Sequence, residues 1–337
     1  MRLSVERREV ELRAPHAAAH GALRARTLFD VVLEGDDDVP GRGEAAPLES
    51  YDGVPDDLAA AALAAHARAV SALPADSTGP QILDACREAA DLPQALAAVD
   101  LALWDRAARR AGKPVAALLT DEPSGSVEVN ATIGALDRTG AGDAAAQAAL
   151  AGFRCVKVKV GMGDDAGRVA AVRAMAGPEI ALRLDANGAW TVDEAVRMIE
   201  VLAPSGLELV EEPVHGINAL RAVRERVAVR VAMDETAAEH GALASAATDA
   251  VCLKIGRCGG ISATLAAASL VRALGGEVYL ASTLDGPLGI AAALHCAAAL
   301  RVELPCGLAT LGQLRLDGDP LPVADGRIAV PAGPGLI

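Results

Sequence analysis

Aromatic side chains are almost absent from this chain of 337 residues. Phe, Trp and Tyr together make up only 2% of it, although 52% of the residues are hydrophobic. The core must therefore be built from Ala, Val and Leu. So few rings disfavour modules that recognise nucleic acids by stacking bases on aromatic side chains.

Positive charge is also in short supply. The chain has 31 Lys and Arg against 45 Asp and Glu, which gives a net charge of −14 and a pI near 4.9. This balance disfavours any partner with a phosphate backbone. An acidic chain can still bind an anionic substrate at a site where a local cation or metal ion makes the electrostatic potential positive. We therefore expect a small-molecule partner and no nucleic acid.

Long apolar runs and paired cysteines are missing as well. The most apolar run, residues 290–300, contains His295 and is too short to cross a bilayer. The N-terminal MRLSVERREVELR is charged throughout, so it has no signal-peptide core. The six cysteines lack CxxC spacing, which predicts buried free thiols in a reducing compartment. We expect a cytoplasmic protein without membrane contact.

The first third of the chain predicts a small α+β unit. Residues 1–50 alternate apolar and polar side chains like antiparallel strands, with a mobile, Ala- and His-rich stretch, APHAAAHGALRA, between them. Residues 55–112 have helical periodicity that ends at Gly112. Strands followed by helices are typical of an α+β arrangement.

The remainder alternates short strands with Ala-rich helices. A closed parallel α/β barrel of the (β/α)₈ type is favoured by this many repeats. The alternative, an open Rossmann sheet, requires a Gly-rich turn, and TIGALDRTGAG does not contain GxGxxG. We expect strands at residues 127–133, 155–160, 180–185, 207–211, 229–234, 250–255 and 277–281, and a weaker eighth at 302–306.

Two lysines share one face of the predicted strand CVKVKVG. Lys157 and Lys159 alternate with Val156, Val158 and Val160. In a barrel covered by helices, the valines face those helices and the lysines face the interior. The alternative is an edge strand whose lysines lie in water.

The strands that follow end in charged residues, in the order Asp185, Glu211, Asp234 and Lys254. Active sites of such barrels lie at the C-terminal rim of the strands. Each carboxylate alone is also explained as a helix N-cap. Three inward carboxylates without enough cations nearby repel each other, and a hard divalent cation relieves that repulsion. Three oxygen ligands with open positions suit Mg²⁺.

The lysine pair predicts a general base beside this metal. Lys157 is close enough along the strand to lower the pKa of Lys159 by charge repulsion. A lysine with a lowered pKa is a usable base near neutrality. A metal plus a base is the apparatus for removing a proton α to a carboxylate.

Five motifs in order, KVKVG, RLDANGAW, LVEEPV, AMDET and LKIGRCGG, resemble the enolase superfamily and its muconate lactonizing subgroup. AVDLALWDRAARRAGKPVAALL is similar to the helix that closes that family's capping domain. The resemblance implies a modified TIM barrel with an N-terminal α+β capping domain. We expect a capping domain over residues 1–120, a catalytic barrel over 121–310 and a C-terminal segment, 311–337, that returns to the cap.

The resemblance also implies roles for individual residues. It assigns Mg²⁺, with Mn²⁺ as a substitute, to Asp185, Glu211 and Asp234. Lys159 becomes the acid/base with Lys157 tuning it, and Lys254 acts on the opposite face. Asn187 and Glu235 orient these groups. Substrate contacts are expected from capping loops near residues 16–26 and 50–52 and from the last strand ends, with Tyr51, Ser282 and Asp285 as candidates.

The overall reaction has several candidates. STLDGPLGIAAALHCAAALRVELPCGLATLGQL resembles o-succinylbenzoate synthases, so dehydration leads. Dipeptide epimerases commonly carry Asp-x-Asp where this chain has Leu304-Pro305-Cys306. Epimerisation, muconate-type cycloisomerisation and a non-catalytic binder of an acidic metabolite are the alternatives; intact Lys159 and Lys254 argue against the last. We expect a homo-oligomer acting on a small carboxylate.

Overall fold

The N-terminal part of this computed structural model is a three-stranded antiparallel sheet, β1 (Arg2–Ala18), β2 (Gly21–Glu34) and β3 (Gly41–Ala45), paired in that order. The structure describes the backbone of residues 1–18 and 21–337 and the side chains of residues 1–14 and 23–337. Most of the stretch 14–25, expected to be mobile, therefore belongs to two paired strands. The predicted capping loop at 16–26 is therefore described only in part. Residues 19–20 lie outside the described residues, and the side chains of 15–22 are not described either.

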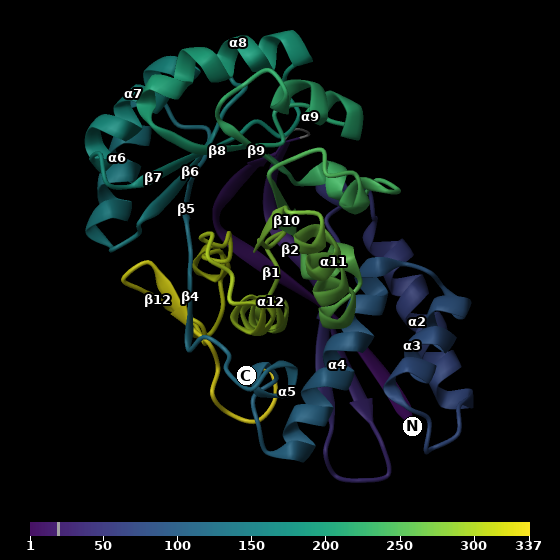
Figure 1. The fold of residues 1–337 in the computed structure, drawn as a ribbon. Helices are drawn as coiled ribbons and strands as arrows, with labels where there is room; N and C mark the ends of the chain where they lie inside the picture. The colour runs from purple at the N-terminus through teal and green to yellow at the C-terminus, as the bar shows by residue number, and fades with distance from the viewer. Residues whose placement is uncertain (19–20) are drawn as a thin grey trace.

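Helices cover one face of this sheet (Figure 1). The helices that follow the sheet in the chain are α1 (Glu49–Asp52), α2 (Asp56–Ala72), α3 (Gly79–Ala89), α4 (Pro93–Ala111) and α5 (Ala116–Leu119), and of these α2, α3 and α4 share an apolar cluster with the sheet. Helix α4 lies directly on β3, because a Cβ at Gly41 or Gly43 would lie 2.0 Å from a carbonyl oxygen of α4. Gly112, in the left-handed region, ends α4 as predicted.

The second part is a curled parallel sheet of seven strands. They are β5 (Ala131–Ile133), β6 (Cys155–Lys159), β7 (Ala181–Asp185), β8 (Leu207–Glu211), β9 (Arg230–Met233), β10 (Ala250–Leu253) and β11 (Glu277–Leu280). They pair in sequence order, and every pairing is parallel. The predicted barrel architecture is confirmed.

Helices form the outer layer of this barrel (Figure 1). They are α6 (Arg138–Leu150), α7 (Asp165–Ala176), α8 (Val192–Leu202), α9 (Ile217–Arg224), α10 (Ile255–Cys258), α11 (Ile261–Ala273) and α12 (Pro287–Leu300). The 3₁₀ helices η1 (Ala203–Ser205), η2 (Glu235–Ala238) and η3 (Ala242–Ala244) lie in connections between barrel strands, and η4 (Leu311–Gln313) lies next to β1. Val156, Val158 and Val160 are buried in one apolar cluster with residues of these helices. The prediction that the valines face the helices is confirmed.

The weak eighth strand is replaced by two isolated bridges. Cys306 bridges to Val129, and Gly307 bridges to Ala281, so this segment links the two ends of the sheet. Pro305 has no N–H to donate, which limits a ladder at this point. The predicted first strand is also divided, because β4 (Ser126–Glu128) pairs outside the barrel and only β5 joins it.

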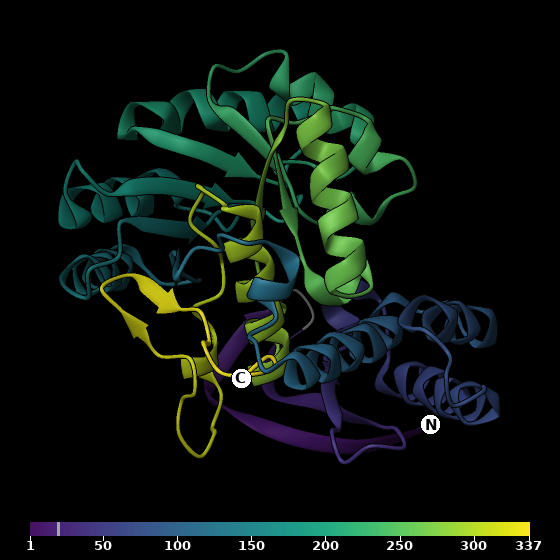
Figure 2. The same cartoon turned by 60° about the horizontal axis from the view of Figure 1, so that its bottom comes forward.

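The C-terminal segment lies against both parts (Figure 2). Strands β12 (Val323–Ala324) and β13 (Arg327–Ala329) form a small antiparallel sheet with β4. The backbone N–H of Arg315 donates to Glu11 of β1 at 2.8 Å, and that of Leu336 donates to Asp105 of α4 at 2.7 Å. The domain boundaries proposed from the sequence stay predictions.

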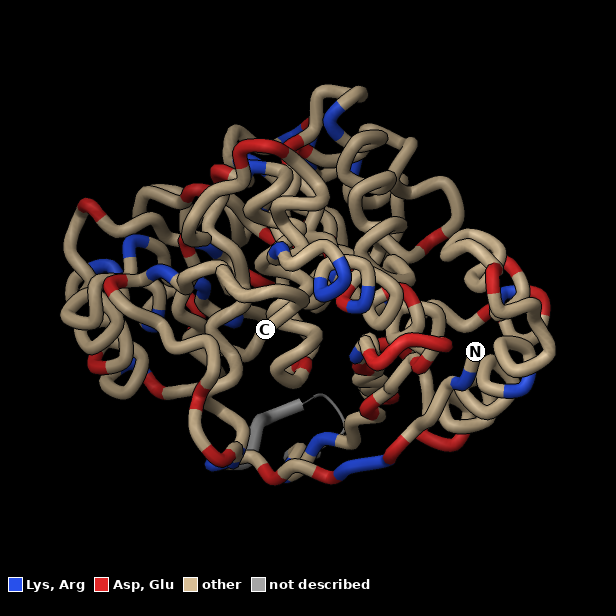
Figure 3. Tube along the Cα trace, turned by 90° about the horizontal axis from the view of Figure 1, so that it is seen from below, with Lys and Arg blue, Asp and Glu red and all other residues tan. Residues whose placement is uncertain are grey.

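Charges of both signs are distributed over the described part of the chain (Figure 3). Figure 3 shows Lys and Arg interspersed with Asp and Glu along the chain. Within the described ranges, no helix is both long and apolar enough to cross a bilayer. All six cysteines are free, and all but the half-buried Cys258 are buried.

Candidate active site

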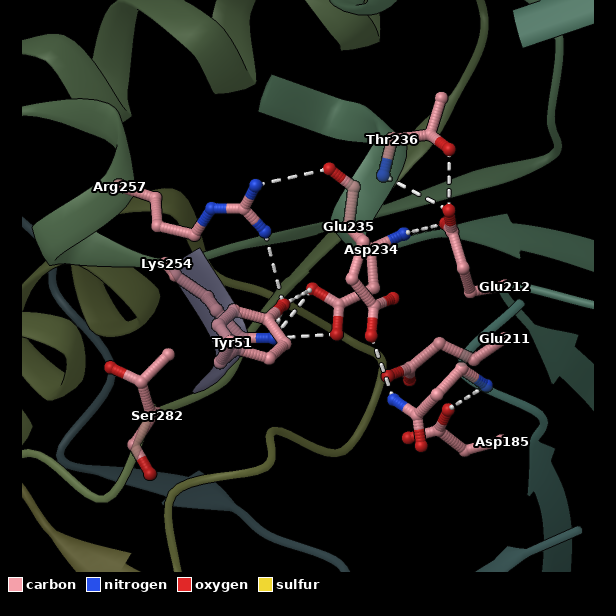
Figure 4. A network of polar contacts seen from close by, with 12 residues as sticks. Tyr51, Asp185, Glu211, Glu212, Asp234, Glu235, Thr236, Lys254, Arg257 and Ser282 are labelled. Atoms are coloured by element: carbon pink, nitrogen blue, oxygen red, sulfur yellow. Dashed lines mark hydrogen bonds and ion pairs between the residues drawn. The ribbon is translucent and has the colours of Figure 1, made fainter. Parts of the chain in front are cut away.

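The C-terminal ends of neighbouring strands bring the predicted charged residues together. Lys159 of β6 pairs in register with Asp185 of β7, which pairs with Glu211 of β8. Asp234 follows β9 and Lys254 follows β10, so three carboxylate strands separate the two lysines. The sequence prediction brought these five residues to one rim, and the structure places them there (Figure 4 draws the carboxylates and Lys254).

Asp185 is buried and bonded to two lysines. Its Oδ2 lies 2.9 Å from Nζ of Lys157 and 2.7 Å from Nζ of Lys159. Burial alone would raise the pKa of Asp185, but the two ammonium groups outweigh it and hold that pKa well below its ordinary value. The Asp185 carboxylate therefore lies between the lysines, which offsets the repulsion expected between them. Tuning of Lys159 by Lys157 stays a prediction.

Glu211 connects the rim to the barrel interior. It accepts from Lys157 Nζ at 2.8 Å and from the Tyr279 hydroxyl at 2.6 Å. Burial raises the pKa of Glu211, and Lys157 offsets this only in part. Tyr279 was not predicted from the sequence, although its position in an alternating strand, EVYL, indicates that it faces inward.

Asp234 is the point where the capping region meets the barrel. Its Oδ1 accepts a hydrogen bond from Lys254 and another, at 2.8 Å, from the hydroxyl of Tyr51 on α1. Lys254 Nζ also donates to Tyr51 Oη at 2.6 Å. Burial alone would raise the pKa of Asp234, but Lys254 and Lys157 together outweigh it and lower that pKa. Tyr51, predicted to contact substrate, therefore contacts two central residues of the site.

The sequence argument for a metal assumed too few cations near the carboxylates, and that assumption is wrong. Lys157, Lys159 and Lys254 all form ion pairs with them. The donor set nevertheless fits Mg²⁺, because it consists of hard carboxylate oxygens from adjacent strands. Nζ of Lys157 lies 2.9 Å from Asp185 and 2.8 Å from Glu211, between the two as a shared cation would be.

Asn187 and Glu235 extend the network from Lys159. Lys159 Nζ donates to Asn187 Oδ1 at 2.7 Å, and Asn187 Nδ2 donates to Glu235 Oε1 at 2.8 Å. Burial and the nearby Asp234 raise the pKa of Glu235 to about 7. The amide therefore bonds to the lysine through its oxygen and to a carboxyl group through its nitrogen, and the orienting role of Asn187 and Glu235 stays a prediction.

Sequence reasoning missed Glu212. Its side chain is buried and accepts from the backbone N–H of Asp234 at 2.8 Å and of Thr236 at 3.0 Å. It also accepts from the Thr236 hydroxyl (Figure 4). These bonds fix the turn that carries Asp234. The doubled acid in LVEEP was the available signal.

Arg257 was also missed. It follows Lys254 by one turn, on α10, and donates to Tyr51 Oη at 3.2 Å and to the Glu235 carbonyl at 3.1 Å. Its guanidinium carbon lies 5.0 Å from the Tyr51 ring centre, and Lys254 Nζ lies 4.4 Å from it. Two cations therefore face one ring, which stabilises the docking of α1 onto the barrel.

Ser282 and Asp285, the other two residues predicted to contact substrate, make no hydrogen bond to the carboxylates of the rim among the described residues. The Ser282 hydroxyl is 2.8 Å from that of Thr310, and Figure 4 shows it apart from the carboxylate network. Asp285 is buried and accepts from the Thr283 hydroxyl at 2.9 Å. Asp285 therefore stabilises its own turn, whereas Ser282 lies at the end of β11.

A cavity of about 590 Å³ lies beside the rim, between η2–η3 and α11. Asp234, Lys254 and Arg257 line its inner part, and most other lining residues are Ala or Leu. Apolar space is therefore available next to the end of β10.

Most of the chain matches two known protein-domain families. Residues 2–120 match the mandelate racemase/muconate lactonizing enzyme N-terminal domain, and residues 141–336 match the enolase C-terminal domain-like family.

Curated relatives include enzymes of two types. An o-succinylbenzoate synthase of Thermobifida fusca (strain YX) is 41% identical over 218 residues, 61% of this chain and 67% of that protein. Muconate cycloisomerase 1 of Pseudomonas putida is 30% identical over 96% of this chain and 91% of that protein.

Solved structures resemble the whole fold. A substrate-liganded L-Ala-D/L-Glu epimerase from Bacillus subtilis has a TM-score of 0.89 at 28% identity, over 100% of this chain and 97% of that one. A dipeptide epimerase from Enterococcus faecalis V583, complexed with Mg and L-Leu-L-Tyr, has a TM-score of 0.87 at 26% identity, over 99% and 98%. The chain therefore belongs to the mandelate racemase/muconate lactonizing enzyme family of the enolase superfamily, whose members are Mg-dependent enzymes.

Proposed function

We propose that this enzyme removes a proton α to a substrate carboxylate and completes a syn-dehydration that yields o-succinylbenzoate. The observation that carries the proposal is the segment after β11. Leu304, Cys306 and Leu308 are buried there. The nearby Asp285 accepts a hydrogen bond from the hydroxyl of Thr283. Along residues 302–310 the only acid is Glu303, and no Asp-x-Asp pair is present to hold a dipeptide ammonium. The similarity to the Thermobifida fusca synthase supports the same reaction.

Lys159 is the proposed base. As a neutral amine it takes the α-proton, and the electron pair of the C–H bond moves into the substrate carboxylate. Asp185, Glu211 and Asp234 would hold a Mg²⁺ ion, which would supply positive charge beside that carboxylate. The Lys159 ammonium then gives its proton to the leaving hydroxyl group. The C–O bond breaks, the electron pair on the substrate forms the new double bond, and water departs.

The other residues of the rim hold this arrangement in place. Asn187 positions the Lys159 amine through its 2.7 Å contact. Lys254, buried on the opposite side of the three carboxylate strands, acts as a fixed positive charge beside the developing negative charge. Tyr51 links the capping region to Lys254 and Asp234 through the hydrogen bonds of its hydroxyl group.

Dipeptide epimerisation is the second candidate, and the position of Lys254 favours it. A lysine on each side of one carbon is what inversion of that carbon requires, and both lysines are present. The epimerase structures that resemble this fold have the same overall architecture. Cycloisomerisation is third, supported by the similarity to the Pseudomonas putida enzyme.

Product formation by the purified enzyme tests the proposal. With Mg²⁺ present, the cyclohexadiene precursor of o-succinylbenzoate, L-Ala-D/L-Glu and cis,cis-muconate are assayed in parallel, with α-deuterium exchange measured on each substrate that carries an α-proton. We expect dehydration of the first. No turnover of the precursor, with rapid α-exchange of the dipeptide, would overturn dehydration in favour of epimerisation. Replacement of Mg²⁺ by Mn²⁺, assembly into a homo-oligomer and a cytoplasmic location stay predictions.

A further inference from the structure

The barrel interior contains a thiol that the proposed reaction does not use. Cys252 is the third residue of β10, and only 2% of it is exposed. It pairs in register with Tyr279, which donates to Glu211. Its neighbours Val251 and Leu253 belong to the apolar layer under the helices, so the thiol points the opposite way, into the barrel.

The thiol lies beside two of the three proposed magnesium ligands. One carboxylate oxygen each of Glu211 and Asp234 and the Sγ of Cys252 all lie within 4.8 Å of one another. Glu211 is fully buried and Asp234 is 4% exposed. Cys252 is a free thiol, and no hydrogen bond to its Sγ occurs among the described residues. An unpartnered buried thiol therefore faces a pair of buried carboxylates.

We propose that Glu211, Asp234 and Cys252 form a second donor set, which binds thiophilic divalent cations such as Cd²⁺ or Zn²⁺. The proposal rests on the metal-binding role of Glu211 and Asp234 in the proposed function. Asp185 belongs to the other set, since the group of ligand atoms that lie within 4.8 Å of one another around the Cys252 thiol comes from Glu211 and Asp234 and does not include Asp185. Two donor sets then share Glu211 and Asp234, one completed by oxygen for hard cations and one by sulfur for soft cations.

The geometry requires only a small adjustment. In a tetrahedral site with ordinary metal–sulfur and metal–oxygen bonds, sulfur and oxygen ligands lie about 3.6 Å apart. The distances between the three ligand atoms, which are at most 4.8 Å, therefore have to shorten by up to roughly 1 Å. Rotation of the side chains supplies a movement of this size. On binding, the S–H bond breaks, a sulfur–metal bond forms, and the proton passes to the buffer.

Cadmium binding to the full-length, metal-free protein tests this proposal in a non-thiol reductant. The thiolate-to-cadmium absorption in the ultraviolet is recorded during titration, and released protons are measured in weak buffer. We expect a band that saturates at one equivalent, with one proton from the thiol. In Cys252→Ser and Cys252→Ala the band disappears and Cd²⁺ affinity falls at least about tenfold.

Matched variants make the result specific. Cys155→Ala removes another buried thiol, at the start of β6 and far from the rim, and should keep the band. Glu211→Gln should weaken Cd²⁺ binding as well. A band that survives in a folded Cys252→Ser or Cys252→Ala protein, or Cd²⁺ binding without any thiolate band in the wild type, would overturn the proposal. Failure to form o-succinylbenzoate would refute the proposed reaction and leave this spectrum unchanged.

Discussion

The hydroxyl of Tyr51 donates a 2.8 Å hydrogen bond to Oδ1 of Asp234, which joins the capping region to the carboxylate rim. The two residues are 183 positions apart in the chain. Because Lys254 donates to the same hydroxyl, the cap touches a proposed metal ligand and a proposed catalytic cation through one group. Docking of the cap and orientation of the rim are therefore physically linked.

The first prediction concerns the loss of the Tyr51 hydroxyl group. Tyr51→Phe keeps the ring that faces Lys254 and Arg257 but loses the hydroxyl's three hydrogen bonds, to Asp234, Lys254 and Arg257, so the free energy of unfolding should fall by at least about 1 kcal/mol. Turnover should fall as well, because Lys254 and Asp234 lose their common partner. Chemical unfolding and steady-state kinetics measure the two effects. Unchanged kinetics in a destabilised variant would limit Tyr51 to cap docking.

Glu211→Gln tests the metal. The change removes one negative charge and keeps the shape, so Mg²⁺ affinity measured by calorimetry and Mg²⁺-dependent activity should both collapse while the barrel stays folded. Circular dichroism provides the folding control. Full wild-type activity in the presence of excess EDTA would refute the Mg²⁺ assignment.

Lys159→Ala tests the base. Turnover should fall by about 10²–10⁴-fold, the range typical for a positioned general base. Asn187→Gly is the matched positioning variant, because glycine tolerates the left-handed backbone at this position (φ 44°) while the side chain that carries the amide is removed. It should lower kcat, with a smaller effect than Lys159→Ala, and alter the pH–rate profile. Wild-type α-exchange in Lys159→Ala would assign the base elsewhere.

Arginine replacements separate the two leading reactions. If Lys254 acts as a fixed charge, Lys254→Arg keeps measurable dehydration, whereas Lys159→Arg abolishes it because a guanidinium is not a base near neutrality. An epimerase loses turnover with either replacement, since each lysine must move a proton. Both variants are assayed on the cyclohexadiene precursor and on L-Ala-D/L-Glu.

The buried carboxyl group of Glu44, which is not one of the rim residues, should make the stability of the protein depend on pH. Its buried carboxyl accepts from the Gly286 N–H at 2.7 Å, and Oε2 has no partner among the described residues. Burial, together with Asp285, raises the pKa of Glu44 from 4.5 to about 8. Because the folded protein holds this proton more tightly than the unfolded chain, stability should fall as pH rises from about 4.5 to 8, by on the order of 5 kcal/mol.

Glu44→Gln should flatten that part of the profile, since the amide has no proton to lose. Denaturant unfolding of both proteins across this pH range measures the difference. An identical slope in wild type and variant would show that Glu44 ionises as readily in the folded protein as in the unfolded one.

The sequence alone determined the barrel and the rim of charged strand ends. Strand side chains alternate with a period of two, and the strand ends of a parallel barrel share one edge. Both relations are local, so the inward direction of Lys157 and the convergence of Asp185 and Glu211 followed from their positions in the strands. Their place in the structure agrees with that expectation.

Only the tertiary structure decided which groups touch. The sequence did not indicate that Tyr51 would contact Asp234, that Arg257 would face Tyr51, or that Asp285 would turn to Thr283. These contacts depend on how α1, α10 and the end of β11 pack against one another, and alternation within one strand does not encode packing between distant elements. The same reason explains why the ion pairs of the lysines with the carboxylates appeared only in three dimensions.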